Sequence, residues 1–296
     1  MDSSSDDMIR HALLAAAALI LAVACAGDPD QARKSPITVG VLPEQRADAL
    51  RRQIEPLLEH IERESGLSLE LVLHDSYEAF SSAFAAEQLD LAWFGGLTYL
   101  VAEESSNARP IVMRDIDSKF TSVFIVRGDA PGSSVTDYSG QRFSFGPDLS
   151  TSGHLMPRYF LGLRGIEPES FFASVQHFAS HDRTAYAVRD NLVDIGVVNH
   201  VVLKSMIGDG RLAPGAVRIL EISPTYANYV WAVRDNLEHS SAVAIRDAFL
   251  ALDPYVEAHR KILAMQGASG YLPAMRADFD EPRAAAAALG LLGETR

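Results

Sequence analysis

The sequence predicts an α/β protein built of two lobes, and three observations lead to this fold class. Apolar runs of strand length alternate with stretches of helical periodicity in two successive series, which is typical of open, mostly parallel sheets covered by helices. A break that contains Gly128, Pro131 and Gly132 separates the two series. A helical tail from Ser240 onward follows them. With 296 residues, 48% of them hydrophobic, the chain is long enough for two domains of ordinary size.

The first series begins with a buried strand at 37–41. Leucine and isoleucine then recur at helical spacing from Leu50 to Ile61, with Pro56 predicting a kink or a first turn inside that helix. The alternating run 67–73 is the second strand. The remaining elements expected in this series are a helix at 77–85 and a strand at 91–94, which closes on Gly95-Gly96.

The second series repeats this order after the β-rich run 120–126. Its expected strands are 141–145, 172–178 and 194–198, and its expected helices are 150–163 and 181–189. Two extended runs, 217–222 and 229–233, precede helices expected at 240–252, 256–265 and 283–292. We expect the chain to cross between lobes near Val126 and near Tyr229. Residues 36–126 with 230–296 would then form the first lobe, and residues 127–229 the second.

Charge and the single cysteine narrow the class of protein. The net charge is −13 and no Lys/Arg cluster is present, so a nucleic-acid-binding function is not expected. Cys25 ends the uncharged apolar run 12–24, which is too short to span a bilayer, and the small residues before it are typical of a bacterial lipidation site. We therefore expect a signal peptide at 1–24, a lipid-anchored tether at 25–35, and a periplasmic or cell-envelope location. The alternative is a buried N-terminal helix with an incidental cysteine.

The acidic residues before Met8 are atypical of a signal peptide, so translation is expected to start at Met8.

The ends of the predicted strands supply the candidate ligand-binding residues, because ligands of open α/β sheets bind beyond the carboxyl ends of strands. Ser150, Thr151 and Ser152 follow a strand and open a helix, where hydroxyls and free backbone N–H groups favour an anion. A serine-rich helix cap without a ligand would have the same spacing. His181 opens another helix, and Asp182 either orients its ring toward an anion or acts only as a helix cap.

Further candidates lie beside the strand ends or at the return crossover, and packing alone is the alternative explanation for each of them. They are Tyr77, Trp93, Phe94, Gly95, Tyr99, Asn199, Tyr226 and Tyr229.

Several of these segments together resemble the PhnD-type periplasmic binding proteins, which serve phosphonate, phosphite and phosphate importers. The resemblance extends over nearly all of residues 36–292 and is carried by Ser-Thr-Ser-Gly at 150–153, by the pair His181-Asp182, and by the segments 90–96 and 194–199. The segments 120–122, 150–161 and 249–254 resemble a branch named for selenate binding more closely still.

The resemblance implies a type II periplasmic-binding fold, with two α/β lobes, a cleft between them and two crossover strands. It implies that the Ser/Thr cluster, Tyr77, Tyr99 and His181 hold a small tetrahedral oxyanion. It further implies a monomer without a cofactor or enzymatic activity, which delivers the anion to the permease and ATPase subunits of an ABC importer.

One departure bears on the ligand. The positions that match the ammonium-binding residues of aminophosphonate binders, around 199–201 and near Tyr229, carry no acid. A site rich in donors and poor in acids favours a fully ionised dianion such as selenate or sulfate over a cationic aminoalkyl ligand, unless Asp182 serves as an acceptor.

Two other classes of function are compatible with parts of the sequence. Ser152, His181 and Asp182 could form a hydrolase triad, but an aspartate adjacent in sequence is poorly placed to orient the histidine ring. The sequence contains no Gly-x-Ser-x-Gly motif for a nucleophile. It also contains no His-Glu-x-x-His motif or cysteine cluster for a metal. A sensor module that reports ligand binding to a membrane partner would share the fold, and it remains the alternative function.

Overall fold

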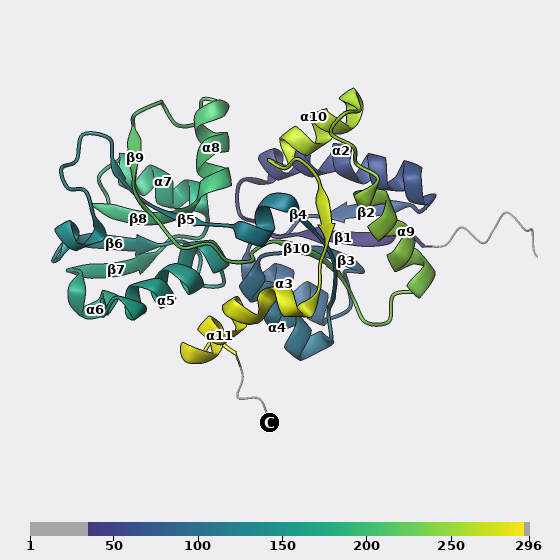
Figure 1. Cartoon of the computed structure of the whole chain (residues 1–296), viewed down its shortest axis with the longest axis horizontal. Helices are drawn as coiled ribbons and strands as arrows, with labels where there is room; N and C mark the ends of the chain where they lie inside the picture. The colour runs from purple at the N-terminus through teal and green to yellow at the C-terminus, as the bar shows by residue number, and fades with distance from the viewer. Residues whose placement is uncertain (1–34, 293–296) are drawn as a thin grey trace, which may run out of the picture. The chain divides into compact units, whose positions relative to one another are not determined.

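The computed structural model describes residues 35–292, and from Pro36 onward the chain forms one compact unit that contains two sheets (Figure 1). The predicted signal peptide and Cys25, with nearly all of the predicted tether, lie outside the described residues. Within the described part, every helix is too short or too polar to cross a bilayer.

The first sheet has six strands in the order β11-β4-β10-β3-β1-β2. Strand β1 pairs in parallel with β2 and β3, whereas β10 runs antiparallel between β3 and β4. Its strands are β1 (Ile37–Val41), β2 (Leu69–Val72), β3 (Leu91–Phe94), β4 (Arg109–Arg114), β10 (Val230–Val233) and β11 (Tyr271–Pro273). The helices of this lobe are α2 (Ala47–Ser65), α3 (Tyr77–Ala85), α4 (Gly96–Ser106), η1 (Asp115–Lys119), α9 (His239–Leu250), α10 (Glu257–Met265), η4 (Arg276–Phe279) and α11 (Asp280–Ala288).

The second sheet has five strands in the order β7-β6-β8-β5-β9. Strand β6 pairs in parallel with β7 and β8, and β5 runs antiparallel to β8 and β9. Its strands are β5 (Ser122–Arg127), β6 (Arg142–Phe145), β7 (Ser174–His177), β8 (Ile195–Asn199) and β9 (Val217–Ile222). The helices of this lobe are η2 (Val135–Tyr138), η3 (Thr151–Leu155), α5 (Met156–Leu163), α6 (Pro168–Phe171), α7 (His181–Arg189) and α8 (His200–Gly208).

Strand β5 explains why the second sheet is covered on both faces. Its side chains alternate, so that Val123 and Ile125 join an apolar cluster with α7 and α8, and Phe124 and Val126 join a separate cluster with η2 and α5. Figure 1 shows α7 and α8 on one side of this sheet and α5 and α6 on the other. Because both faces of β5 are buried, its sequence is a nearly continuous apolar run.

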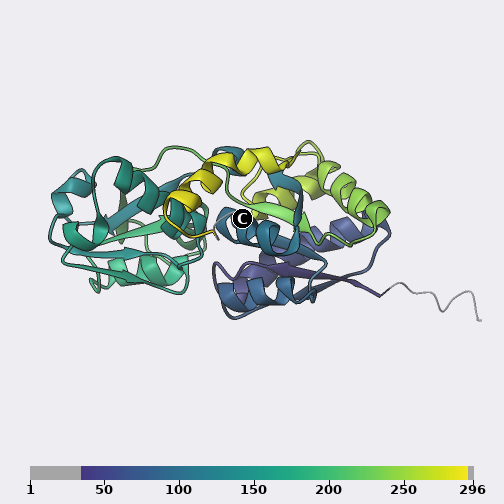
Figure 2. The ribbon, with the colours of Figure 1, turned by 90° about the horizontal axis from the view of Figure 1, so that it is seen from below.

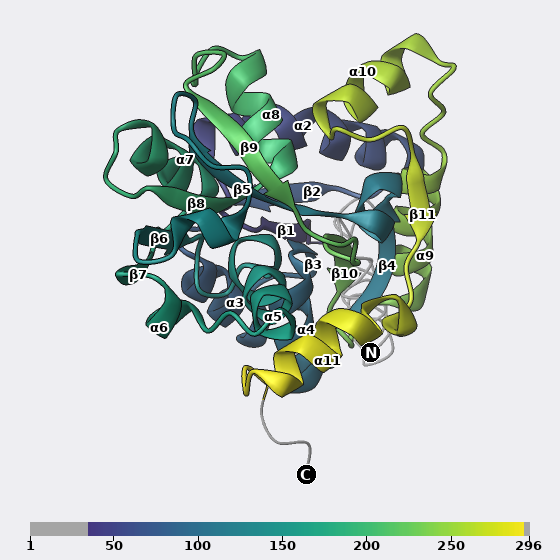
Figure 3. The same cartoon turned by 60° about the vertical axis from the view of Figure 1, so that its left-hand side comes forward.

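Two segments connect the lobes, and one lies earlier in the chain than predicted. Strand β5 belongs wholly to the second sheet, so the first crossover precedes Ser122 instead of lying near Val126. The second crossover follows β9 and ends at β10. The backbones of Phe120 and Tyr226 pair in an isolated antiparallel bridge, which ties the two crossovers together, and Figure 3 shows β5 and β9 side by side as they reach it.

Some elements lack the sequence pattern that would have predicted them. Helix α4 follows directly on β3, where only a glycine turn was expected, and its residues from Gly96 to Tyr99 are all buried. A segment that is buried on every side has no amphipathic stripe, so periodicity cannot reveal this first part of the helix. Helix α2 continues through Pro56 to Ser65 and ends at Gly66, whose φ of 69° favours glycine.

Helix α11 lies between the lobes. It packs against α4 of the first lobe and against η3 and α5 of the second, and Figure 2 shows it in yellow alongside both groups of elements.

Candidate functional site

Ser150 lies where β6 leads into η3, and its neighbours orient its hydroxyl group. The Ser150 oxygen accepts the backbone N–H of Gly153 at 2.9 Å and lies 3.2 Å from Nε2 of His181. Gly153 permits this approach, because a Cβ at that position would lie 2.8 Å from the His181 ring. With both acceptor sites of the oxygen occupied, the Ser150 hydroxyl proton is left to donate to another group.

His181 is held as a neutral donor. Its Nδ1 accepts the backbone N–H of Asn199 at 3.2 Å, so the ring proton resides on Nε2 and is directed at Ser150. Burial lowers the pKa of His181 to about 3. Asp182 does not orient the ring: its carboxylate accepts from the Ser180 hydroxyl at 2.5 Å and from the Arg183 N–H at 2.9 Å.

Thr151 and Ser152 differ in their surroundings although both are buried. The Thr151 hydroxyl oxygen accepts the backbone N–H of Leu97 at 2.7 Å, at the start of α4. A Cβ at Gly96 would lie 3.2 Å from Cγ2 of Thr151, so glycine allows the two helix starts to approach. The Ser152 hydroxyl makes no hydrogen bond to any described residue.

Four buried donor groups around these helix starts have no hydrogen-bond partner among residues 35–292. They belong to the side chains of Tyr77, Trp93, Ser152 and Asn228. Burial raises the pKa of Tyr77 well above its usual value; the charge of Glu44 adds to the rise and the hydroxyl of Ser150 opposes it. Buried donors are costly when unpaired, and several of them together are suited to a polar ligand rich in acceptors.

Glu44 belongs to this candidate site and was not selected from the sequence. It lies just beyond the carboxyl end of β1, and its buried carboxylate oxygen Oε2 accepts from the Tyr229 hydroxyl and from Nδ2 of Asn199, the latter at 3.2 Å. Burial raises the pKa of Glu44 to about 7, although the Tyr229 hydrogen bond and the charge of Arg114 lower it. The strand-end rule used for the other candidates would have selected this residue.

The expectation of a site poor in acids is therefore wrong. The acid comes from the first strand of the first lobe instead of the positions near Asn199 and Tyr229, which turn out to hold it in place.

The ion pair of Arg114 and Asp117 packs against aromatic rings of the candidate site. The guanidinium group of Arg114 donates to both carboxylate oxygens of Asp117 at 2.6 and 2.8 Å, and both side chains are buried. The same guanidinium lies 5.0 Å from the ring centre of Trp93 and 5.2 Å from that of Tyr229. The pair thus packs against the ring of Tyr229, whose hydroxyl donates to Glu44.

The remaining predicted residues fall into two groups. Gly95 caps α4 beside Thr151. The Tyr226 hydroxyl lies 2.6 Å from the Ser122 hydroxyl. Burial raises the pKa of Tyr226, and the Ser152 hydroxyl opposes this rise. Two others are not part of the cluster.

Tyr99 and Phe94 lie away from the other candidates. The Tyr99 hydroxyl donates to Glu103 at 2.6 Å, and its ring contacts Phe279 with centroids 4.7 Å apart. The Phe94 ring packs edge-on against Phe80 and Phe84 in the core of the first lobe. The structure thus gives Tyr99 and Phe94 packing roles.

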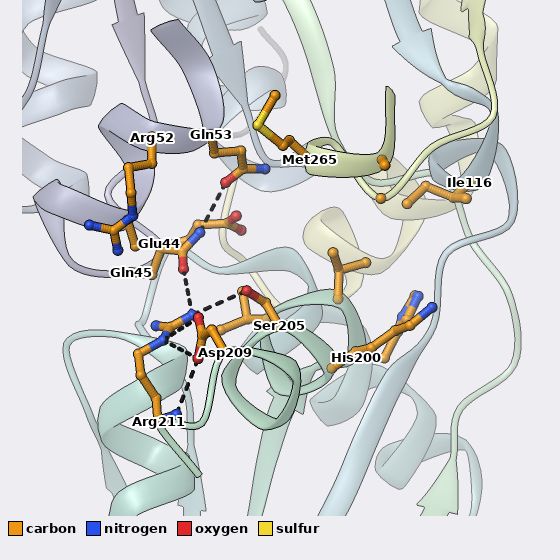
Figure 4. A pocket seen from close by; sticks show the side chains of 16 residues that line it. Glu44, Gln45, Arg52, Gln53, Ile116, His200, Ser205, Asp209, Arg211 and Met265 are labelled. Carbon is orange, nitrogen blue, oxygen red and sulfur yellow. Dashed lines mark hydrogen bonds and ion pairs between the residues drawn. The ribbon is translucent and has the colours of Figure 1, made fainter. Parts of the chain in front are cut away.

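A pocket of about 540 Å³ adjoins this cluster, and Glu44 lines it (Figure 4). Its walls come from α2 and α10 of the first lobe and from α8 of the second. Gln45 links the two sides: its amide donates to Gln53 of α2 at 3.0 Å and accepts from Arg211, beyond α8, at 3.3 Å.

One cluster has the composition of a metal site. Asp148, His154 and His177 each place a potential ligand atom within 4.8 Å of the others. However, His154 Nδ1 lies 2.6 Å from the Asp148 carbonyl oxygen, and its Nε2 accepts from Arg158 at 3.0 Å. Because both ring nitrogens are engaged, one by a cation, the cluster is arranged to support the loop before Ser150 and not to coordinate a metal.

Comparison with known proteins identifies relatives over most of the chain. The family described as "ABC transporter, phosphonate, periplasmic substrate-binding protein" matches residues 39–279. A probable ABC transporter phosphite binding protein, PhnD1 of Prochlorococcus marinus (strain MIT 9301), is 30% identical over 250 residues, which cover 80% of this chain and 84% of that protein. The phosphate-import protein PhnD of Mycolicibacterium smegmatis is 27% identical and covers 93% of this chain and 94% of its own length.

Solved structures agree with these relatives. PhnD1 from Prochlorococcus marinus in complex with methylphosphonate has a TM-score of 0.80 and 28% identity, covering 86% of this chain and 98% of that chain. A binding protein component of an ABC phosphonate transporter from Pseudomonas aeruginosa has a TM-score of 0.76 and 19% identity, covering 85% of this chain and 86% of that chain. These likenesses confirm the two-lobed type II periplasmic-binding fold.

Proposed function

This chain belongs to the periplasmic substrate-binding proteins of phosphonate ABC transporters, and from that premise we propose that it captures a small phosphorus oxyanion of the phosphonate, phosphite and phosphate class for import. The relatives are binding proteins and not enzymes. The permease and ATPase subunits of an importer are the partners that this function requires.

The observation that carries the proposal is the set of buried, unpaired donors at the start of η3. Ser152 and Tyr77 have hydroxyls without a partner in the described chain, and Ser150 has a hydroxyl proton left to donate. The N–H groups at a helix start add a favourable field for an anion. A tetrahedral oxyanion would accept from all of these groups at once.

Two features favour phosphorus over selenium. Two relatives are named for phosphite and phosphate, and a similar solved structure holds methylphosphonate. Glu44 places an acceptor beside the donors, whereas a fully ionised selenate ion offers no proton to accept. The preference for a selenate-like dianion rested on a site without acids, and that premise has been overturned.

Isothermal titration calorimetry of the mature domain tests this function, with phosphate, phosphite, methylphosphonate, sulfate, selenate and selenite as ligands. We expect the tightest binding from one of the phosphorus oxyanions. A domain that binds selenate or sulfate more tightly than all three would contradict the proposal.

Growth separates import from signalling. A strain lacking the gene should fail to grow on the preferred ligand as its sole phosphorus source. If the deletion strain instead takes up the ligand normally but no longer regulates other genes in response, the protein is a sensor.

We propose further that Cys25 anchors the protein to a membrane of the cell envelope through a lipid, after removal of residues 1–24. The support is the apolar run and the small residues that precede the only cysteine of the sequence.

A further inference from the structure

Glu44 poses a physical problem for an anion-binding site. Its buried carboxylate accepts from the side chain of Asn199, whose backbone N–H donates to the His181 ring beside Ser150. An anion held at Ser150 and the Glu44 carboxylate would therefore be neighbours in a region of low dielectric. Two negative charges at such a separation repel strongly when neither is neutralised. Something in the site must therefore remove the repulsion when an oxyanion binds.

The geometry leaves one carboxylate oxygen of Glu44 available. Oε2 accepts hydrogen bonds from the Tyr229 hydroxyl and the Asn199 side-chain amide, whereas Oε1 accepts none from any residue of the described chain. Glu44 also lines the pocket of Figure 4, and it is the residue that connects this pocket to the cluster of donors. Oε1 is therefore the carboxylate oxygen that is left to contact a ligand.

We propose that Glu44 and the bound oxyanion share one proton, so that the site takes its ligand as a hydrogen oxyanion. The inference rests on the proposed function and deepens it by naming the class of ligand. Phosphonate, phosphite and phosphate carry oxygens basic enough to share a proton near neutral pH. Sulfate and selenate are much weaker bases, and they leave the proton on Glu44 alone.

The charges around Glu44 do not remove the need for this proton. The positive charge of Arg114 lowers the pKa of Glu44, but Arg114 is already paired with Asp117 through two hydrogen bonds. His181 is neutral because its Nδ1 accepts a backbone N–H and its ring is buried. Tyr77 and Tyr229 keep their protons because burial raises the pKa of both hydroxyls.

The pocket side of Glu44 carries further titratable groups on α2, on α8 and after α8. They are Arg52, His200, Lys204, Asp209 and Arg211. Arg52 is paired with Asp48, and Arg211 is paired with Asp209. Burial lowers the pKa of His200, so that it too is neutral at neutral pH.

Burial of Glu44 is consistent with a resident proton, since its pKa of about 7 keeps a large fraction protonated at neutral pH. Binding of a dianion would raise that pKa further.

Calorimetry of the mature domain with methylphosphonate, in buffers of different ionisation enthalpy, tests the proposal. Above about pH 8, where Glu44 and the ligand are both ionised, the wild-type protein should take up about one proton on binding. Its affinity should fall by about tenfold for each pH unit above that range. Selenate should bind more weakly than methylphosphonate at every pH. A wild-type protein that takes up no proton, or binds selenate as tightly as methylphosphonate, would overturn the proposal.

The variant Glu44→Gln locates the proton. An amide can donate to a dianion without taking up a proton, so the variant should show no uptake, and its affinity should be independent of pH above about pH 8. At alkaline pH it should bind methylphosphonate more tightly than the wild-type protein, which a merely structural role would not produce. Asp182→Asn, which changes the rival acidic acceptor, should retain the wild-type proton uptake.

If Glu44→Gln still takes up a proton, the proton resides on another group and the inference is wrong. Failure of the proposed function has a different signature, because no phosphorus oxyanion would then bind the wild-type protein at any pH. Should the variant not fold, the wild-type proton count decides alone.

Discussion

The hydroxyl oxygen of Thr151 accepts the backbone N–H of Leu97 at 2.7 Å and thereby joins the start of η3 in the second lobe to the start of α4 in the first. Ser152, the next residue, has a buried hydroxyl without a partner in the described chain. Adjacent hydroxyls of one motif are therefore assigned different tasks: Thr151 holds the lobes together, and Ser152 is available to a ligand.

Ser152→Ala should weaken binding of methylphosphonate by about tenfold to hundredfold, because a buried hydrogen bond to a charged group contributes roughly 1.5–3 kcal/mol. The free energy of unfolding should hardly change, since removing the hydroxyl leaves no buried group unpaired. Calorimetry and urea denaturation measure the two effects. Ser170→Ala in the short helix α6 is the control, and it should alter neither quantity.

Thr151→Val should have a cost in stability that Ser152→Ala lacks. It keeps the shape of the side chain but leaves the Leu97 N–H without its acceptor, which costs roughly 1–3 kcal/mol. Equal stability of Thr151→Val and the wild-type protein would contradict the assignment of Thr151 to the contact between lobes.

The parts of the candidate site that were selected from the sequence are those with a local signal. Ser150 to Ser152 combine a strand end, a helix start and hydroxyl side chains within a few residues, so no tertiary information is needed to select them. The alternation of strands and helices is equally local, and it predicted the two-lobed fold that the comparisons confirm.

The residues that were missed depend on tertiary placement. Glu44 becomes a site residue only because Asn199 and Tyr229, far away in sequence, converge on its carboxylate. Tyr99 was misassigned because α4 was not predicted: once the helix starts at Gly96, Tyr99 and Glu103 share a face that points toward Phe279. A β-rich run such as β5 likewise does not indicate which sheet it joins.

The neutral state of His181 should appear in the pH dependence of stability. Its pKa is about 3 in the folded protein and about 6.5 when unfolded, so below that value the unfolded chain binds a proton that the folded chain does not. The stability contributed by this difference is fully present above about pH 6.5 and is lost by about 1.4 kcal/mol per pH unit as the pH falls.

Urea denaturation of the wild-type protein and of His181→Gln measures this contribution. Between about pH 6.5 and about pH 4.5 the wild-type protein should lose roughly 2–3 kcal/mol more than the variant. The other histidines and Glu44 are common to both proteins and cancel in the difference. A difference that stays constant with pH would mean that the pKa of His181 is not lowered in the folded protein.

Lipid anchoring can be tested at Cys25, which lies outside the described residues. Cys25→Ser should yield an unprocessed precursor without lipid, because the sequence contains no other thiol. Mass spectrometry of the membrane fraction distinguishes the two forms, and the N-terminus of the precursor should map to Met8. Ala26→Ser, next to the proposed lipidation site, serves as the control and should be lipidated normally. A Cys25→Ser protein that still carries the lipid would disprove the anchor.

Removing one partner of the buried pair Arg114–Asp117 should lower the free energy of unfolding more than replacing both partners. Asp117→Asn should lower the free energy of unfolding by about 3–5 kcal/mol, since it leaves the guanidinium group without a counter-charge in a dry interior. Replacing both residues, as Arg114→Met with Asp117→Leu, should cost less than the single change, because no uncompensated charge remains. Urea denaturation measures all three proteins.

Arg52→Met, which breaks the exposed pair with Asp48, is the matched control and should cost less than about 1 kcal/mol. If the double variant is instead less stable than Asp117→Asn, the pair contributes net stability beyond mutual compensation. The double variant removes both the charge of Arg114, which lowers the pKa of Glu44, and the smaller opposing effect of Asp117. Proton uptake on ligand binding should therefore begin at a somewhat higher pH in this variant.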